Sequence, residues 1–395
     1  MTNIPIISIT GTNGKTTTAR MVSNILMNQG YKVGVTTTHG IYLNGQCIRR
    51  GDCAGPKSAL RVLEDPGVEF AVLETARGGI IRKGLVYGKA DVAVFTNLTE
   101  DHLGLNGIKT MDDLWNIKCK VIEAVKDNGV SVLNADDPWV MKSLNRARGK
   151  ILLFGMDRNN PHLQNWINKG DSVLYTEGDS IYLSSANSLT HVIKIDQIPA
   201  TLKGALKHNI YNSMASIGAT LAADVPINII RSSLESFDTT PEINPGRFNI
   251  YDLGEFKVIL DFGHNIDGYR VTLEGLRNLK PERLTGIVGL PGNRRNEDMW
   301  KVGYLAGKYF DRLIIREDKK LRGRQPYEAG TIIRSGAIAA GMHEHAVEII
   351  PDENIGLLKL MTEAQKGDII AVFYDKIIPI TKIIDGYRQI LLQKA

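Results

Sequence analysis

The sequence predicts an α/β protein in which a P-loop domain, built on a parallel sheet and carrying a β-rich insertion, precedes a smaller Rossmann-like α/β domain. Two observations support this prediction. Short runs of Val, Ile and Leu alternate with helical stretches, which is typical of a parallel sheet covered on both faces. The alternation stops at a polar segment with Pro241, residues 238–244, and restarts beyond it, which indicates a second domain.

Length and composition indicate a globular protein of two or three domains. Of the 395 residues, 43% are hydrophobic and 23% are charged, as is usual for folded domains. No stretch approaches the roughly 20 apolar residues of a membrane span, and no basic segment precedes an apolar core at the N-terminus. The 3 cysteines are too few for a disulfide framework, which favours a reducing cytoplasm. The net charge of +5 suits an acidic or phosphorylated substrate, and we expect neither a nucleic-acid nor a membrane partner.

The first domain is expected over residues 1–240. After a strand at Ile4–Ile9, a helix with an apolar stripe fits Lys15–Asn28. The polar residues 155–201 contain short alternating pieces, and we expect a β-rich excursion there. Further strands are predicted at Val33–Val35, Phe70–Leu73, Val92–Phe95, Val130–Leu133 and Ile151–Phe154, and further helices at Asn209–Ala223 and Ile227–Phe237.

The second domain is expected over residues 247–395, which is long enough for a core of its own. Its strands are predicted at Val258–Asp261, Gly286–Leu290, Arg312–Ile315, Val347–Ile350 and Ile369–Phe373. Its helices are predicted at Tyr269–Leu279, Met299–Phe310, Ala329–Ala340 and Ile355–Gln365.

The strongest functional signal is a glycine-rich turn between the first strand and the first helix. It consists of Gly11, Thr12, Asn13, Gly14, Lys15, Thr16 and Thr17. Backbone N–H groups at such a turn and at a helix N-terminus bind phosphate oxygens. We expect Lys15 to reach the β- and γ-phosphates of a nucleotide and the Thr16 hydroxyl to bind Mg²⁺. The general GxxxxGK[ST] pattern is not strictly met, because Ile9 stands where its first glycine would be.

Polar side chains also follow other strands of the predicted sheet, at the edge where ligands bind in parallel sheets. Glu74 ends one strand and is a candidate for holding Mg²⁺ directly or through water. Residues 75–79 after it are expected to form a flexible turn. His102 follows another strand and is a candidate metal ligand, with Asp101 to orient it. Asn134–Asp137 suits ribose or base contacts, or alternatively an Asx turn or a helix N-cap, and the sequence leaves both open.

These motifs, in this order, resemble those of the Mur ligase family over nearly the whole chain. The segments that carry the resemblance, besides the phosphate loop and Glu74, are NLTEDHLG (97–104), VLNADD (132–137), HNIYN (208–212), PGR (245–247) and DFGHN (261–265). Residues 36–56, 72–85, 291–298 and 314–324 resemble one branch of the family in particular, the ligase half at the C-terminal end of cyanophycin synthetase.

The resemblance implies an ATP-dependent amide ligase that forms ADP. Such enzymes transfer the γ-phosphate of ATP to a carboxylate, and an amine then attacks the acyl-phosphate. Because a carboxylate is a poor electrophile, phosphorylation supplies the leaving group that it lacks. Catalysis then depends mainly on positioning and on stabilising concentrated negative charge.

The resemblance also implies roles for single residues. Thr16 and Glu74 are similar to the ligands of the Mg²⁺ that binds the β- and γ-phosphates, and Lys15 to the phosphate-loop lysine. His102 is similar to a ligand of a second Mg²⁺. Many members carry a carbamylated lysine some 15 residues after this histidine; Lys118 is the best-placed candidate and a metal ligand by the same resemblance.

Lys120 is the rival for the carbamylated position, and a plain lysine on the helix surface remains the alternative to both. Asn209 resembles the residue that contacts the adenine region. Arg247 resembles an interdomain arginine that reaches ATP phosphate on domain closure, and Asp261 resembles the residue that holds the ribose.

Two further segments depart from the family pattern or leave alternatives open. Ile266 stands where the family usually has proline, directly after His264 and Asn265. Arg294 and Arg295 are placed by the resemblance near the nucleotide and the incoming amine, or else belong to a solvated basic loop.

The place of the phosphate loop in the chain adds an expectation about the substrate. Gly11 lies ten residues from Met1, which leaves no room for the UDP-sugar domain of the peptidoglycan Mur ligases, and the ATP-grasp module of cyanophycin synthetase is absent too. We therefore expect a carboxylate substrate that is not UDP-linked, and a chain that does not make cyanophycin alone.

By resemblance, the carboxylate belongs to an aspartyl or other acidic peptide and the amine to a basic amino acid such as Arg or Lys. The basic run Lys319–Arg324 faces this substrate or forms a solvated loop. A second hypothesis is a subunit that activates a carboxylate with ATP and needs a partner chain for the amine or for a second ligase activity. A third is a non-catalytic ATP-binding regulator. The sequence leaves open whether the protein forms a homo-oligomer.

Overall fold

The computed structural model describes residues 4–101, 103–105, 107–186 and 188–394. His102, a predicted metal ligand, therefore lies outside the described residues. The chain divides into two compact units, Met1–Asp238 and Thr239–Ala395. No described helix is long and apolar enough to cross a membrane.

The first unit contains eleven strands and eight α-helices among its described residues. The strands are β1 (Ile6–Thr10), β2 (Val33–Thr37), β3 (Gly40–Leu43), β4 (Gln46–Arg50), β5 (Phe70–Glu74), β6 (Ala90–Phe95), β7 (Val125–Asn134), β8 (Lys150–Gly155), β9 (Val173–Glu177), β10 (Ser180–Ser185) and β11 (Ser188–Lys194). The helices are α1 (Lys15–Asn28), α2 (Pro56–Leu63), α3 (Arg77–Lys83), α4 (Met111–Glu123), α5 (Pro138–Met141), α6 (Pro161–Lys169), α7 (Lys207–Leu221) and α8 (Ile227–Glu235).

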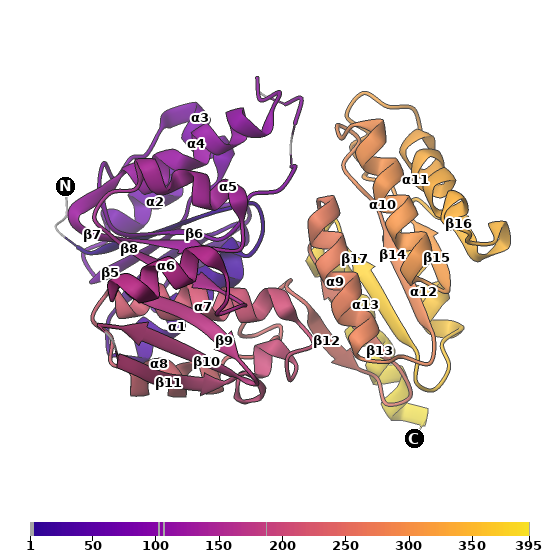
Figure 1. Ribbon diagram of the computed structural model, residues 1–395. Helices are drawn as coiled ribbons and strands as arrows, with labels where there is room; N and C mark the ends of the chain where they lie inside the picture. The colour runs from indigo at the N-terminus through magenta and orange to yellow at the C-terminus, as the bar shows by residue number, and fades with distance from the viewer. Residues whose placement is uncertain (1–3, 102, 106, 187, 395) are drawn as a thin grey trace. The chain divides into compact units, whose positions relative to one another are not determined.

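The strands of the first unit form one sheet in the order β11-β10-β9-β8-β7-β6-β1-β5-β2-β3-β4 (Figure 1). The strands from β9 to β2 in this order are parallel. An antiparallel hairpin extends each end of the sheet, β10–β11 at one end and β3–β4 at the other. The predicted parallel sheet is confirmed. The β-rich excursion joins this same sheet, because β9 pairs with β8 and helix α6 precedes it.

Alternation along the strands explains why both faces of this sheet are covered. In β1, Ile7 and Ile9 pack with α1, α7 and α8, whereas Ile6 packs with α2 on the opposite face. Phe95 of β6 packs with α3 and α4 on the same face as α2. The helices accordingly lie on opposite sides of the sheet (Figure 1). Because both faces of the sheet are buried, successive side chains along each strand must be apolar.

The second unit is a smaller α/β structure. Its strands are β12 (Asn249–Asp252), β13 (Lys257–Asp261), β14 (Leu284–Val288), β15 (Arg312–Ile315), β16 (Val347–Ile349) and β17 (Ile369–Phe373). Its α-helices are α9 (Ile266–Asn278), α10 (Asn296–Tyr309), α11 (Glu328–Ala339), α12 (Glu353–Thr362) and α13 (Ile377–Lys394). The strands follow the order β12-β13-β17-β14-β15-β16, with β12 antiparallel at the edge and the others parallel.

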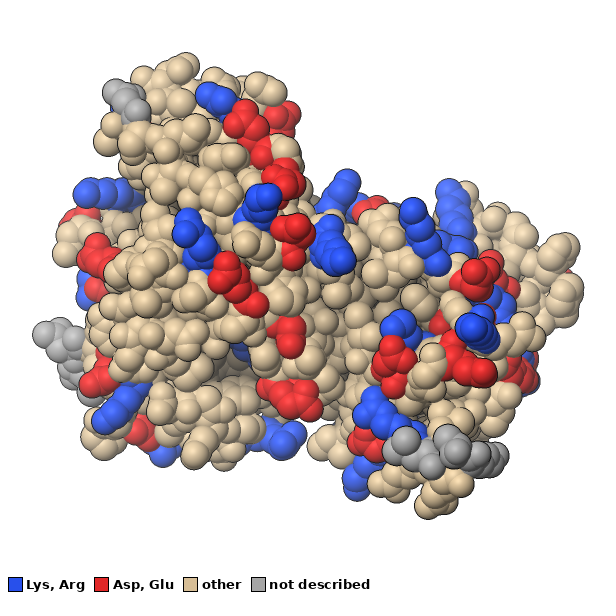
Figure 2. All heavy atoms as spheres, turned by 90° about the horizontal axis from the view of Figure 1, so that it is seen from below, with Lys and Arg blue, Asp and Glu red and all other residues tan. Residues whose placement is uncertain are grey.

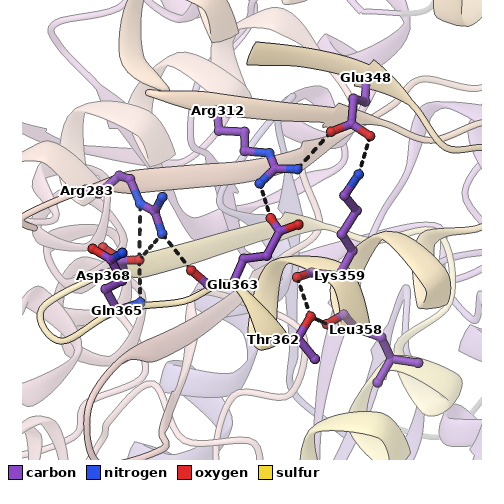
Figure 3. Close-up of polar contacts among 9 residues, drawn as sticks. All are labelled: Arg283, Arg312, Glu348, Leu358, Lys359, Thr362, Glu363, Gln365 and Asp368. Atoms are coloured by element: carbon purple, nitrogen blue, oxygen red, sulfur yellow. Dashed lines mark hydrogen bonds and ion pairs between the residues drawn. The ribbon is translucent and has the colours of Figure 1, made fainter. Parts of the chain in front are cut away.

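Ion pairs join the amino ends of the parallel strands in the second unit (Figure 3). Arg283, just before β14, lies 2.6 Å from Asp368, just before β17. Arg312 at the start of β15 lies 2.8 Å from Glu348 of β16 and also pairs with Glu363. These pairs occupy the edge opposite the carboxyl ends of the strands, so they hold the sheet together and leave the other edge to the loops that carry the predicted site.

Helices α10 and α11 approach so closely that they require glycine. A Cβ on Gly303 would lie 1.9 Å from the Ile333 carbonyl oxygen, whereas a Cβ on Gly386 in α13 would meet no atom within 4 Å. We expect Gly303→Ala to force the helices apart and to lower the free energy of unfolding by about 2 kcal/mol or more. Gly386→Ala, the matched control, should leave it unchanged or raise it by up to about 1 kcal/mol. Urea denaturation of both variants checks this expectation, and equal midpoints would contradict it.

Candidate active site

The predicted phosphate loop lies between β1 and α1, and its two glycines have no room for a side chain. A Cβ on Gly11 would lie 1.9 Å from Thr96 Oγ1, and one on Gly14 would lie 2.3 Å from Asn212 Oδ1. Gly14 is also the N-cap of α1, with a left-handed backbone (φ 86°), and within the described residues no side chain caps this helix. The first turn of α1 therefore presents backbone N–H groups of the kind that bind phosphate. Lys15 Nζ donates to the Thr12 carbonyl at 2.8 Å.

The segment after β6 holds the phosphate loop in place. Asn97 accepts from Thr12 N with its carbonyl and from Asn13 N with Oδ1, both at 2.9 Å. Thr96 Oγ1 donates to the Asn13 carbonyl at 2.7 Å. The sequence motif around residues 97–104 pointed only to metal binding, so Thr96 and Asn97 are supporting residues that sequence reasoning missed. Their position directly after a strand next to the loop was the available signal.

Three oxygen atoms gather where β1, β2 and β5 end. Thr16 Oγ1 donates to Glu74 Oε2 at 2.8 Å, and Thr38 N donates to the same oxygen at 3.0 Å. The Thr16 and Thr38 hydroxyl oxygens lie 3.0 Å apart. Hydroxyl and carboxylate oxygens are ligands that suit Mg²⁺. Thr38 was not singled out from the sequence.

This oxygen cluster fits a metal that is bound together with phosphate. In the described part of the chain, no group of three or more His, Cys, Asp or Glu side chains is arranged to hold a metal ion. Mg²⁺ usually binds through one or two protein oxygens, with waters and substrate phosphates as its other ligands. Thr16 and Glu74 beside the phosphate loop match that arrangement.

Lys118 reaches the same edge from helix α4. Its side chain is buried, and Nζ donates to the Gly11 carbonyl. Burial is the main cause that holds the pKa of Lys118 well below its usual value, and the positive charges of Lys15 and Arg77 act in the same direction. A neutral amine is therefore favoured at this position. Lys120, the rival candidate, is exposed on the surface of α4.

The segment after Glu74 is not the flexible turn that the sequence suggested. Helix α3 begins at Arg77, and Ala76 N donates to the Ala54 carbonyl at 3.3 Å. A Cβ on Gly79 would lie 2.9 Å from Pro56 Cδ, so this segment is closely packed. Arg77 is buried near Lys118. Sequence reasoning named Arg77 only as part of the turn.

The segment Asn134–Asp137 follows the structural alternative rather than the ligand-binding one. Asn134 Oδ1 accepts from Asp136 N at 3.0 Å, which is an Asx turn. Asp137 caps α5 by accepting from Trp139 N and Val140 N, and Asp136 accepts from Tyr211 OH at 2.8 Å. These carboxylates are used by the fold.

Helix α7, which packs beside α1 on the same face of the sheet, supports the phosphate loop. Asn209 donates to the Ala200 carbonyl at 2.7 Å and accepts from Asn212 Nδ2 at 2.9 Å. Asn212 in turn lies against Gly14. Asn209 is buried, and its hydrogen bond with Asn212 orients that side chain. The predicted contact between Asn209 and adenine remains a prediction.

In the second unit, Arg247 and Asp261 lie near each other. Asp261 accepts from Phe248 N at 2.9 Å. The Arg247 guanidinium lies 5.0 Å from the centre of the Phe262 ring and donates to the Phe262 carbonyl at 3.4 Å. Burial raises the pKa of Asp261 to about 6, and the charge of Arg247 opposes that increase.

The proline expected after Asn265 is not needed to start α9. Asn265 caps this helix by accepting from Gly268 N at 2.8 Å, so Ile266 is its first residue. Proline is common at the first position of a helix. Isoleucine can replace it here without moving the start of α9, because Asn265 caps the helix.

The basic segments of the second unit are largely engaged with the protein. Arg295 pairs with Asp298 at 2.6 Å, and Arg294 is nearly buried. Arg324 donates to the carbonyls of Gly292 and Arg294 at 2.6 and 2.8 Å, so it fixes the loop that carries those arginines. Lys and Arg side chains are interspersed with Asp and Glu on the face of the molecule in Figure 2.

Comparison with known proteins agrees with this geometry. Residues 9–220 match the model of the Mur ligase middle domain, and residues 246–373 match that of the Mur ligase, glutamate ligase domain. The cyanophycin synthetase of Synechocystis sp. is 36% identical over 387 residues. That alignment covers 98% of this chain and 44% of the relative, so the chain spans less than half the length of that protein.

Solved structures show the same fold at low sequence identity. One is FolC from E. coli in complex with ADP, with a TM-score of 0.72 and 18% identity over 98% of this chain and 90% of that one. Another is a bifunctional folylpolyglutamate synthase/dihydrofolate synthase with Mn, AMPPNP and L-glutamate bound, with a TM-score of 0.70 and 16% identity over 97% and 89% of the two chains. The predicted fold class is confirmed.

The raised pKa of Asp261 predicts a pH-dependent stability. Between about pH 4 and pH 6 the carboxyl keeps its proton in the folded state and loses it in the unfolded state. The wild type should therefore lose stability relative to Asp261→Asn as the pH rises through this window, and the difference should stay constant above it. Urea denaturation at several pH values measures this. Asp385→Asn, at an exposed site on α13, is the matched control and should follow the wild type; a parallel course for Asp261→Asn would contradict the expectation.

Proposed function

Because this chain belongs to the Mur ligase family, we propose that it is an ATP-dependent amide ligase that forms ADP. It joins an amino acid or another amine to a carboxylate substrate. The observation that carries this proposal is the edge at which the phosphate loop, the oxygen cluster of Thr16 and Glu74, and the buried Lys118 meet. Binding of a nucleotide alone does not require a buried lysine beside the phosphate loop.

The proposed reaction has two steps. In the first, a carboxylate oxygen of the substrate attacks the γ-phosphorus of ATP, the bond to the β,γ-bridging oxygen breaks, and ADP leaves. In the second, the amine nitrogen attacks the carbonyl carbon of the acyl-phosphate, loses a proton, and phosphate leaves. Both steps gather negative charge, which positioned cations and N–H dipoles stabilise.

The residues of the first unit supply these stabilising groups. The backbone N–H groups of the first turn of α1 and the side chain of Lys15 bind the β- and γ-phosphates. Thr16 and Glu74 would hold Mg²⁺, which supplies charge neutralisation at the phosphates. We propose His102 for a second metal, and Asn209, Arg247 and Asp261 for contacts to the nucleotide, on the strength of the family motifs in which they stand.

We further propose that Lys118 carries a carbamate. The neutral ε-amine attacks carbon dioxide, a C–N bond forms, and a proton is released, so that a cation becomes an anion. The lowered pKa of the Lys118 amine supports this, because only the unprotonated amine reacts. The anion would also be compensated by Lys15 and Arg77, the two cations that oppose the protonated lysine.

The carboxylate substrate is proposed to be an aspartyl or other acidic peptide and the amine a basic amino acid. The proposed substrates rest on the relation to cyanophycin synthetase alone, whereas the proposed reaction rests on the whole family. An ADP-release screen with ATP, Mg²⁺ and a panel of carboxylates and amines identifies the pair. Turnover that appears only after a second chain is added would favour a carboxylate-activating subunit.

Lys15→Ala tests the reaction itself. Because the lysine charge stabilises the transferred phosphate, we expect ADP formation to fall on the order of 100-fold or more. Lys32→Ala, at an exposed site just beyond α1, is the matched control and should keep wild-type turnover. ADP release by Lys15→Ala at the wild-type rate would contradict the role of Lys15 in phosphoryl transfer, whereas a wild type that binds ATP but releases no ADP with any substrate pair would favour a non-catalytic ATP-binding regulator.

Lys118→Ala tests the carbamate. We expect a loss of about 100-fold in ADP formation, whereas Lys120→Ala on the exposed side of α4 should behave as the wild type. NMR of protein supplied with ¹³C-labelled bicarbonate should show a carbamate carbon in the wild type and in Lys120→Ala but not in Lys118→Ala. A carbamate signal that survives in Lys118→Ala would assign the modification to another residue.

A further inference from the structure

The edge strand β4 is unusually open. It pairs with β3 alone in the sheet order of the described residues, and all of its residues, Gln46–Arg50, are exposed. Asn44 and Gly45 connect the two strands with positive φ values of 47° and 80°, as in a type I′ hairpin turn. An open edge of this kind offers backbone N–H and C=O groups to an extended chain.

The opposite edge of the same sheet, strand β11, is partly covered. At β11, the Arg231 guanidinium donates to the carbonyls of Val192 and His191 at 2.6 and 3.1 Å. That edge is therefore partly covered by a side chain of the protein. The contrast between the two edges indicates that openness at β4 is a property of this hairpin and not of the sheet in general.

Strand β4 runs toward the candidate active site. It is antiparallel to β3, which is antiparallel to β2, so its carboxyl end lies at the same edge as the carboxyl end of β2. Beyond that end, Gly51 N donates to the His39 carbonyl and Cys53 N to the Thr37 carbonyl, both at 3.0 Å. The residue between His39 and Thr37 is Thr38, whose backbone N–H binds Glu74. A chain laid along β4 would thus run toward the edge of the sheet at which the proposed metal and phosphate site lies.

The end of β4 nearest the site is positively charged. Arg49 and Arg50 are exposed, and in the part of the chain that the structure describes neither guanidinium has an ion pair or a hydrogen bond. Successive strand residues point to opposite faces, so the two guanidinium groups flank the edge. Asp52, the nearby carboxylate, accepts from Ala54 N at 3.2 Å and is engaged with its own loop.

The hairpin is also held firmly. Arg20 of the phosphate-loop helix donates to Tyr42 OH of β3 at 3.4 Å and lies 5.7 Å from the centre of its ring. A Cβ on Gly40 would lie 2.4 Å from the Arg49 carbonyl oxygen. These contacts tie β3 to α1 and β4 to β3, so the edge keeps a constant relation to the phosphate loop.

We propose that β4 binds an extended acidic segment of the carboxylate substrate as an added strand, with Arg49 and Arg50 as its anion-binding residues. The proposal rests on the proposed function, because it names where the acceptor of the phosphoryl group docks. Backbone hydrogen bonds along about 16 Å of edge supply the affinity, as in other strand-addition complexes. Charge-assisted contacts from the two arginines select carboxylates. The bound segment then leaves β4 at the edge of the sheet that carries Thr38 and Glu74, and residues beyond it extend along that edge toward the site.

The test measures binding of a fluorescently labelled, N-acetylated hexa-aspartate peptide by anisotropy, with no nucleotide present. We expect the double variant Arg49→Glu/Arg50→Glu to bind about 10-fold or more weakly than the wild type. Lys194→Glu, which makes the charge change of one of these two substitutions on the opposite edge strand β11, should bind within about 2-fold of the wild type. Equal binding by the double variant and the wild type would overturn the proposal and leave the arginines as charges that only prevent unwanted strand pairing.

A second peptide separates strand addition from simple charge attraction. Hexa-aspartate N-methylated at alternate residues keeps its charge but loses backbone donors, and we expect it to bind about 10-fold more weakly. Equal binding of the two peptides would overturn strand addition. Urea denaturation confirms that each variant is folded. ADP release by the wild type is measured separately, so a failure of peptide binding is not confused with a failure of the ligase proposal.

Discussion

The close contact between the phosphate loop and the segment after β6 is the constraint on which the rest of the site depends. Gly11 and Gly14 leave no space for a Cβ, and the loop amides of Thr12 and Asn13 are taken up by Asn97. This contact decides where α1 begins, and therefore where Thr16 meets Glu74. The remaining elements of the first unit can be understood as supports for that geometry. Helix α7 supports the loop through Asn212, and helix α4 brings Lys118 to the Gly11 carbonyl.

Burial of ionisable groups is the second common feature. In the first unit, desolvation favours the neutral form of Lys118, and in the second unit it favours the protonated form of Asp261. Both groups lie beside cations, Lys15 and Arg77 in one case and Arg247 in the other. Nearby positive charge disfavours a charged lysine and favours an ionised aspartate. Each group is thus poised to change its charge when a ligand or a covalent modification alters its surroundings.

The sequence predicted those parts of the fold that depend on local pattern. The helix predicted at Lys15–Asn28 has the same bounds as α1, because an apolar stripe and a glycine turn coincide there. The parallel strands were predicted because continuous Val and Ile runs are needed where both faces of a sheet are buried. The hairpin β3–β4 was missed, since Gln46–Arg50 is polar and exposed. Helix α13 was missed too, although its apolar residues Ile377, Ile380, Ile384, Tyr387 and Leu391 recur at helical spacing and pack in the core. Pro379 lies in its first turn, where a helix tolerates proline.

The candidate site was predictable only where a motif names the residue. Lys118 and Lys120 both stand close to the distance after His102 at which the family carries its modified lysine. Burial on α4 distinguishes them, because Lys118 is buried and Lys120 is exposed. Thr38 was missed because its role is a backbone contact to Glu74, and backbone contacts between distant segments leave no trace in residue identity. For Asn134–Asp137 the sequence left a ligand site and a turn equally open, and hydrogen bonds within the fold decided for the turn.

The sheet order has a consequence for how the protein is made. The phosphate loop occupies residues 11–17, yet it takes its shape from Asn97 and Asn212, which are synthesised much later. Strand β1 likewise can pair with β5 and β6 only after some 60 to 90 further residues have been synthesised. Such distant pairings are slow to form, and until they do an apolar strand and a glycine-rich loop stay exposed on the nascent chain. Competence to bind a nucleotide is therefore acquired by this unit only after Asn97 and Asn212 have been made, long after the phosphate loop itself.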